Sequence, residues 1–226
     1  MTNNHGLGRV PSPFDKRDYN LDWFIPKIGL KISLIKERNW LFPLTEALDQ
    51  GETPHCVGFG IADFGINLPT FTNYTNDDGD RFYYMCKELD NEPLAETGSN
   101  LRSAAKVMKN LRRISSYAFA NTLAQVKYWL LNKGPLIAGT IWTEEMFTPN
   151  TFNVLNIGGN VVGGHAYLLN EWTKNNYIGI QNSWGSSWGI GGKAYISVEN
   201  FEKIFRQGGE VLTSVELEYK MAKKPR

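Results

Sequence analysis

Helical and extended patterns occupy separate stretches of this chain, and this order limits its fold more than any other feature. Apolar residues recur at helical spacing in segments 53–66, 80–89, 101–111 and 121–131. After Pro135 the pattern changes to short β-rich runs between Gly and Asn clusters, which predicts strands at 136–142, 165–170, 177–181, 193–198 and 211–218. Because helices and strands are segregated, we predict an α+β fold with two lobes and a cleft between them.

Composition and charge exclude several classes of function. Of the 226 residues, 42% are hydrophobic and 13% aromatic, which suffices for a sizeable core and excludes a wholly disordered chain. The net charge is +1, and the only basic cluster is the tail Lys223, Lys224 and Arg226, so we predict no nucleic-acid partner. No stretch approaches the ~18 consecutive apolar residues of a membrane span, so we predict no membrane partner either.

The cysteine content and the first residues bear on the compartment. Cys56 and Cys86 are too few for a disulfide scaffold, and residues 1–6 lack the charged start and apolar block of a secretory signal. If Met1 is the native start, we expect a cytoplasmic or other intracellular, reducing location, or association with a virion if the source is viral.

Three segments that lie far apart in the sequence carry the groups of thiol chemistry. Cys56 begins a predicted helix, whose partial positive charge favours the thiolate that attacks carbonyl carbon. His165 begins a predicted strand, and Asn182 ends another with an amide that can accept a hydrogen bond from an imidazole. Gln50, six residues before Cys56, can donate to an oxygen near the Cys56 N–H. Together these are the nucleophile, base, orienting group and oxyanion donor that acyl transfer requires.

These segments resemble the papain-like cysteine peptidases. The matching runs are Gln50 to Cys56, Gly163-Gly164-His165-Ala166 and Asn182-Ser183-Trp184-Gly185, and the resemblance covers about 49–196. It implies a single papain-like domain with a helical lobe at about 46–130 and a β-barrel-like lobe at about 1–45 and 131–226, with the active-site cleft between them. It assigns the oxyanion, nucleophile, base and orienting roles to Gln50, Cys56, His165 and Asn182.

The resemblance also implies a wall of substrate-binding residues. These are Gly98, Ser99, Leu101, Ala166 and Trp184, and Trp184 is also the indole that shields the His–Asn contact. Small, apolar positions near this wall, including Gly139 and Gly163, favour a hydrophobic substrate side chain two residues before the cut.

The chain departs from the family pattern in three respects. The family's Cys-Gly-Ser-Cys-Trp run reads Thr53-Pro54-His55-Cys56-Val57, so the aromatic residue and a disulfide cysteine are missing, as in bacterial and bacteriophage branches. His165 follows Cys56 by 109 positions, fewer than the ~130–150 of papain and cathepsins. Nothing before Gln50 in this sequence is long enough for the usual inhibitory prodomain. If Met1 is the native start, we expect restraint by a protein inhibitor or assembly partner, by sequestration or by a narrow substrate choice.

We predict a cysteine-type endopeptidase that acts on peptides or proteins without cofactor or metal. The Cys56–His165 pair is expected to rest as thiolate and imidazolium. The alternative is a papain-fold structural or binding protein, such as a virion or assembly component, with little or no proteolysis. An enzymatic alternative is amide transfer or ligation, in which an amine attacks the same thioester.

The remaining polar candidates receive structural interpretations. Cys86 is expected in the core among apolar neighbours. His55 is expected at the cleft rim or in solvent, because adjacent helical residues point ~100° apart. His5 is expected in an unstructured terminus, and Asn76–Asp80 is expected to form a solvated turn that caps the next helix rather than a calcium loop.

Overall fold

One mixed sheet organises the part of the chain that the computed structural model describes, residues 5–25, 35–41 and 46–215. The strand order is β1-β3-β9-β4-β6-β7-β8-β5, and β2 pairs with β6. The β1–β3 and β5–β8 pairs are parallel and the others antiparallel. The strands are β1 (Tyr19–Asn20), β2 (Arg38–Asn39), β3 (Ser116–Ala120), β4 (Leu136–Thr143), β5 (Val154–Leu155), β6 (Val161–Trp172), β7 (Tyr177–Gln181), β8 (Lys193–Ser197) and β9 (Glu210–Val215).

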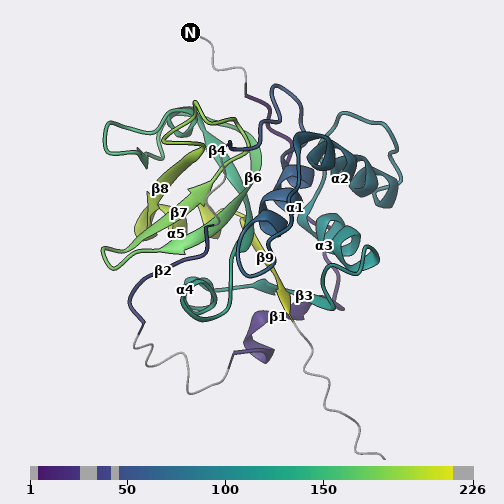
Figure 1. The fold of residues 1–226 in the computed structure, drawn as a ribbon, viewed down its shortest axis with the longest axis horizontal. Coiled ribbons are helices and arrows are strands. Elements are labelled where there is room, and N and C mark those ends of the chain that lie inside the picture. The colour runs from purple at the N-terminus through teal and green to yellow at the C-terminus, as the bar shows by residue number, and fades with distance from the viewer. Residues whose placement is uncertain (1–4, 26–34, 42–45, 216–226) are drawn as a thin grey trace, which may run out of the picture.

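Three helices lie together on one side of this sheet (Figure 1). They are α1 (Cys56–Ile66), α2 (Asn76–Leu89) and α3 (Leu101–Asn110). Every residue of α1 is buried, so α1 is the central helix of this group. At Gly58 an added Cβ would lie 2.3 Å from the Gly79 carbonyl oxygen, which confirms the close packing that the glycines of this segment predict.

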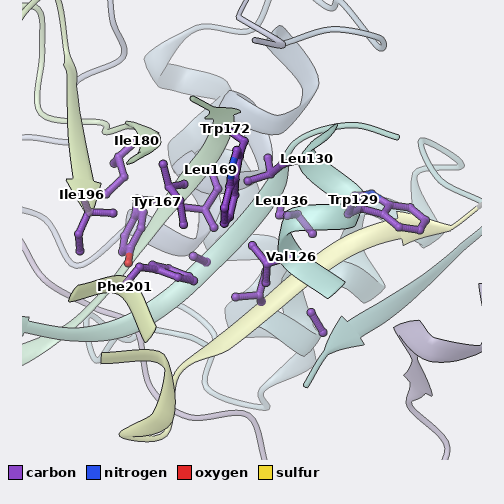
Figure 2. Packing of buried hydrophobic residues seen from close by; sticks show 14 of the residues in the cluster. Val126, Trp129, Leu130, Leu136, Tyr167, Leu169, Trp172, Ile180, Ile196 and Phe201 are labelled. Carbon is purple, nitrogen blue, oxygen red and sulfur yellow. The ribbon is translucent and has the colours of Figure 1, made fainter. Parts of the chain in front are cut away.

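The other helices belong to the sheet side of the molecule. Helix α4 (Leu123–Asn132) and α5 (Val198–Arg206) contribute to one hydrophobic cluster with the strands, and the short 3₁₀ turns η1 (Leu21–Trp23) and η2 (Glu144–Phe147) also contribute. Figure 2 shows Leu130 of α4 beside Leu169 and Trp172 of β6 in this cluster. The division into lobes near residue 130 stays a prediction.

Strand β6 separates two hydrophobic clusters. Its side chains alternate, as they must in a strand: Tyr167 and Leu169 belong to the sheet cluster, whereas Ala166 and Leu168 belong to the cluster around α1 and α3. The boundary between the two cores therefore runs along the strand that carries His165.

The α+β prediction is confirmed, and the long elements lie close to their predicted positions. Three differences have physical reasons. Strand β6 begins at Val161 rather than 165, because the two glycines continue the ladder with β4. Helix α5 was not predicted, because its apolar Phe201 and Ile204 follow β8 without a turn signal. Strand β3 is only five residues long and was also missed. The end of the predicted strand 211–218 lies outside the described residues.

Among the described residues, no helix combines the length and the hydropathy that a bilayer crossing requires.

Candidate active site

Cys56 is the first residue of α1, and its side chain is fully buried. The preceding carbonyl, that of His55, accepts hydrogen bonds from the N–H groups of Gly58 and Phe59, which closes the first turn. The thiol contacts the backbone of Gly8, Val57 and Ala166. Burial raises the pKa of Cys56 to about 11, because water no longer stabilises the thiolate.

His165 and Asn182 form a hydrogen bond across neighbouring strands. Pairing of β6 with β7 brings them together, and His165 Nε2 lies 2.8 Å from Asn182 Oδ1. That oxygen also accepts from the Ser183 N–H, so the histidine nitrogen must donate. His165 Nδ1 has no hydrogen-bond partner among the described residues, which leaves it available to exchange a proton. Trp184 stacks on the imidazole with ring centroids 4.6 Å apart and so keeps this contact dry.

Gln50 lies in the loop before α1, and its side chain is buried. Its amide nitrogen Nε2 donates to the Thr53 carbonyl at 2.7 Å and to the Gly6 carbonyl at 3.2 Å. Its backbone N–H donates to the Ser183 carbonyl at 2.9 Å. A backbone hydrogen bond therefore links Gln50 to Ser183, the residue that follows Asn182.

The four residues predicted from three distant segments thus converge. Cys56 touches the backbone of Ala166, the neighbour of His165; His165 bonds Asn182; and the loop after Asn182 bonds Gln50. Their catalytic roles stay predictions, but the groups that acyl transfer needs lie at one place, between the sheet and α1.

The predicted substrate-binding wall lies at the start of α3. Ser99 is buried and offers its backbone N–H and carbonyl to a neighbouring extended chain. The Gly98 carbonyl accepts from Lys87 Nζ at 2.8 Å, which fixes the wall from behind. Leu101 is fully buried in the same cluster as Cys56, and Ala166 lies across from it on β6.

Residues 5–10, which we call the cleft segment, lie along this wall. The N–H groups of Gly8 and Arg9 donate to the Gly164 carbonyl on one side, while Gly8 and Val10 pair with Ser99 on the other. His5 stacks on Trp184 with centroids 4.6 Å apart and planes at 7°. The expectation that His5 is unstructured is therefore wrong, because the indole provides a flat surface for its ring. In Figure 1 the cleft segment descends between the sheet and the helices.

Burial shifts the pKa values of both Cys56 and His165. Burial lowers the pKa of His165 to about 4 and raises that of Cys56 to about 11. Both shifts oppose the thiolate–imidazolium pair expected from the sequence, because burial penalises the charged form of each group. The protonation state of the pair stays a prediction.

Asp63 was not identified by sequence reasoning. It lies seven residues after Cys56 in α1 and is fully buried. Gln181 Nε2 donates to its Oδ1 at 2.8 Å and Ser183 Oγ to its Oδ2 at 3.1 Å. These partners flank Asn182, so Asp63 holds the orienting asparagine in place. A carboxylate in an otherwise apolar helix was the available signal.

His55 is buried, contrary to the expectation of a rim or solvent position. Its Nδ1 lies 2.6 Å from Asp80 Oδ1, and its Nε2 lies 2.8 Å from Glu96 Oε2. The ring also stacks on Tyr83. Each ring nitrogen therefore has one carboxylate within hydrogen-bond distance. His55 thereby connects α2 and the loop at Glu96 to the start of α1.

Two further sequence interpretations can be compared with the structure. Cys86 forms no disulfide and is buried in the same hydrophobic cluster as Cys56, as expected. Burial raises the pKa of the Cys86 thiol. The segment 76–80 is the first turn of α2 rather than a separate turn, and Thr75 caps it through a capping box with Asp78. Within the described residues, no three His, Cys, Asp or Glu side chains cluster closely enough to hold a metal ion.

Comparisons with known proteins agree with this architecture. No protein-family model matches the chain. Over 78 residues, 33% of this chain, it is 30% identical to cathepsin B-like cysteine proteinase 3 of Ostertagia ostertagi, and the match spans 45% of that relative's length.

Solved structures give the broader match. Xylellain, a cysteine protease from Xylella fastidiosa, superposes with a TM-score of 0.74 at 17% identity, covering 94% of this chain and 97% of that one. Procathepsin B of Trypanosoma congolense superposes with a TM-score of 0.69 at 14% identity, covering 94% of this chain and 86% of that one. Recombinant stem bromelain precursor superposes with a TM-score of 0.61 at 15% identity, covering 95% of this chain and 80% of that one. The chain therefore has the fold of the papain-like cysteine proteases.

Proposed function

We propose that this chain is a cysteine endopeptidase that hydrolyses peptide bonds in a peptide or protein substrate. The observation that carries the proposal is the hydrogen bond between His165 Nε2 and Asn182 Oδ1. It leaves His165 Nδ1 without a hydrogen-bond partner among the described residues, and the neighbouring Ala166 backbone contacts the Cys56 thiol. A protein that only bound peptides would need neither a fixed imidazole nor a thiol there. The names of the similar proteins support the same chemistry.

The reaction follows from the positions of these groups. Cys56 passes its proton to His165, and the thiolate attacks the scissile carbonyl carbon. The resulting oxyanion accepts hydrogen bonds from the Cys56 N–H and from Gln50 Nε2. While residues 5–10 lie in the cleft, Gln50 Nε2 donates to the Gly6 carbonyl instead. His165 then protonates the leaving amine. Water, whose proton His165 removes, hydrolyses the thioester and restores the thiol.

The cleft segment must leave before a substrate can enter. It occupies Ser99 and Gly164, the backbone groups that would pair with an extended peptide, and it touches the thiol. Its departure admits water, which favours thiolate and imidazolium. An intramolecular segment thus takes the role that we expected of a separate inhibitor or assembly partner. Both cysteines are unpaired, which supports the further proposal of a reducing location.

A papain-fold binding protein is the second candidate. The occupied cleft favours it, and so do the pKa shifts by which burial opposes the charged forms of Cys56 and His165, because a protein that never opens would look the same. The two candidates differ in what happens when the cleft segment is displaced.

The experiment compares the parent chain with Gly8→Val. A Cβ at Gly8 would lie 1.9 Å from the Pro54 carbonyl oxygen, and Pro54 is continuous with α1, so the segment has to shift. Each protein is treated with an epoxysuccinyl thiol-protease inhibitor and analysed by peptide mass spectrometry, with Cys86 as the internal control. We expect fast labelling of Cys56 alone in Gly8→Val, and its loss on adding His165→Ala.

Hydrolysis is measured in parallel on fluorogenic peptides, with and without an added amine. Release of the free acid supports the peptidase, and capture of the amine supports amide transfer. A folded Gly8→Val variant that neither labels at Cys56 nor cleaves any peptide contradicts the peptidase and favours the binding protein.

A further inference from the structure

A buried polar network joins the middle of α1 to the end of β7. Its centre is the carboxyl group of Asp63, which is fully buried. Gln181 Nε2 donates to one oxygen of this group, and Ser183 Oγ donates to the other. Asn182, the hydrogen-bond partner of His165, is the residue between these two donors. Asp63 therefore holds the chain on both sides of Asn182.

Two asparagines extend the network to the end of α1 and to β6. Asn67 follows the last residue of α1, and its Nδ2 donates to the Asp63 carbonyl oxygen at 2.8 Å and to Gln181 Oε1 at 2.9 Å. Asn170 Nδ2 lies 3.2 Å from Asn67 Oδ1 and 3.3 Å from Gln181 Oε1. The pairing of β6 with β7 shifts register at Asn170, and such a bulge can redirect a side chain. All of these side chains are buried, so bulk water does not compete for their hydrogen bonds.

The network connects the helix of the proposed nucleophile to the strands of the proposed base and its partner. Cys56 is the first residue of α1, His165 lies in β6, and Asn182 follows β7. Helix α1 lies beside β6 (Figure 1) and shares an apolar cluster with it. Apolar contacts are not directional and permit small shifts of a helix along a strand, whereas hydrogen bonds hold particular atoms at particular distances.

A fully buried carboxyl group does not favour stability. Two side-chain hydrogen bonds offset its loss of hydration only in part, and burial still raises the pKa of Asp63 to about 7. An apolar residue at this position would not carry that cost. The contribution of Asp63 is therefore sought in the geometry that its hydrogen bonds impose.

We propose that Asp63 is a positioning residue that fixes the start of α1 against the His165–Asn182 pair. It touches neither substrate nor reacting atoms and acts through Gln181 and Ser183. This inference rests on the proposed peptidase function, to which it adds a residue that neither the motifs nor the family resemblance indicated.

The hydrogen bond between His165 and Asn182 can be observed by NMR without any substrate. The sequence contains three histidines, so isotope labelling of the histidine nitrogens gives few signals, and His165→Ala identifies the one from His165. We expect a slowly exchanging Nε2–H proton in the parent, because this donor is buried and hydrogen-bonded. Asp63→Ala should speed its exchange about tenfold or more by loosening the site. Asp63→Asn should keep it slow, because an amide can bond both Gln181 and Ser183.

Activity is measured on fluorogenic peptides in the Gly8→Val background. We expect Asp63→Ala to lower kcat roughly 10- to 100-fold with little change in KM, because a misplacement of ~1 Å can cost about 10²-fold. Asp63→Asn should restore kcat. The matched control is Ile61→Ala, which shortens a buried apolar side chain of the same helix. It should lower stability in urea unfolding but keep both kcat and the slow His165 proton.

An equally slow His165 proton in folded Asp63→Ala overturns the proposal, whether or not the chain cleaves peptides. So does an unchanged kcat in a variant whose proton exchanges fast, or fast exchange in Ile61→Ala as well. If only Asp63→Ala speeds exchange but Gly8→Val cleaves nothing, the positioning of His165 stands and the peptidase fails. Should Asp63→Ala not fold, Gln181→Met, which removes one donor to Asp63, takes its place in both assays with the same criteria.

Discussion

Replacing Asp63 by Asn should make the protein more stable near neutral pH, although it removes a buried carboxyl group. Burial raises the pKa of Asp63 from its ordinary 3.8 to about 7, because the carboxylate is fully desolvated and receives only two side-chain hydrogen bonds. The folded chain then holds a proton that the unfolded chain releases. The stability that this proton contributes is complete below pH 4 and is lost as the pH rises through about 7.

The size of the effect follows from the same values. Each pKa unit corresponds to roughly 1.4 kcal/mol, so the free energy of unfolding loses up to about 4 kcal/mol between pH 4 and pH 8 from this one residue. Asn imitates the protonated acid at every pH. Its oxygen can accept from Gln181 Nε2, and its NH₂ can donate to Ser183 Oγ.

The assay is urea unfolding, followed by tryptophan fluorescence, at several pH values from 4.5 to 8.5. Taking the difference between Asp63→Asn and the parent cancels the contribution of other groups, including His165, whose lowered pKa costs stability as the pH falls from about 6.5 to about 4. We expect the difference to grow with pH and to level off above about 7. Glu88→Gln, on the exposed side of α2, serves as control. Parallel profiles for Asp63→Asn and the parent would refute the reasoning.

Further predictions concern the cleft and its supports. Gly8→Val should speed inhibitor labelling of Cys56 at least about tenfold at pH 7, and a rate equal to the parent's would mean that the segment does not cover the thiol. In the parent, the rate of Cys56 alkylation should keep rising as the pH approaches 11, whereas in Gly8→Val the rate should level off at lower pH. Coincident pH–rate profiles of the two proteins would contradict the effect of burial. In the Gly8→Val background, Gln50→Ala should slow acylation roughly 10²–10³-fold in single turnovers, and no change would remove Gln50 from the site. His55→Ala should cost roughly 2–4 kcal/mol of unfolding free energy, because Asp80 and Glu96 lose their common partner and a cavity opens; a loss below about 0.5 kcal/mol in urea unfolding would show that the tie is unimportant.

Local sequence was sufficient for the longer elements and for the candidate residues of the site. Cys56 at a helix start, His165 after two glycines and Asn182 at a strand end were predicted because each has a short, informative context, and their catalytic roles stay predictions. The fold class followed from the order of helical and extended patterns. These features depend on neighbours along the chain, which a sequence displays directly.

The features that could not be predicted from the sequence depend on contacts between residues far apart in the chain. Arg9 and Glu210 are 201 positions apart, and nothing around either residue indicates an ion pair. The cleft segment has no regular secondary structure, so periodicity says nothing of where it lies. The buried position of His55 was missed because helical spacing alone does not show that the carboxylates of Asp80, on α2, and Glu96, in a loop, lie beside its ring.

The covalent attachment of the cleft segment sets how a substrate must compete with it. A segment tethered within the same chain acts at an effective concentration in the millimolar range, whatever the concentration of the protein. The fraction of molecules with an open cleft should therefore be the same in dilute and in concentrated solution. A substrate with only micromolar abundance gains access either by binding much more tightly than residues 5–10 or after a change, such as the loss of the Arg9–Glu210 ion pair, that lowers the affinity of the tethered competitor.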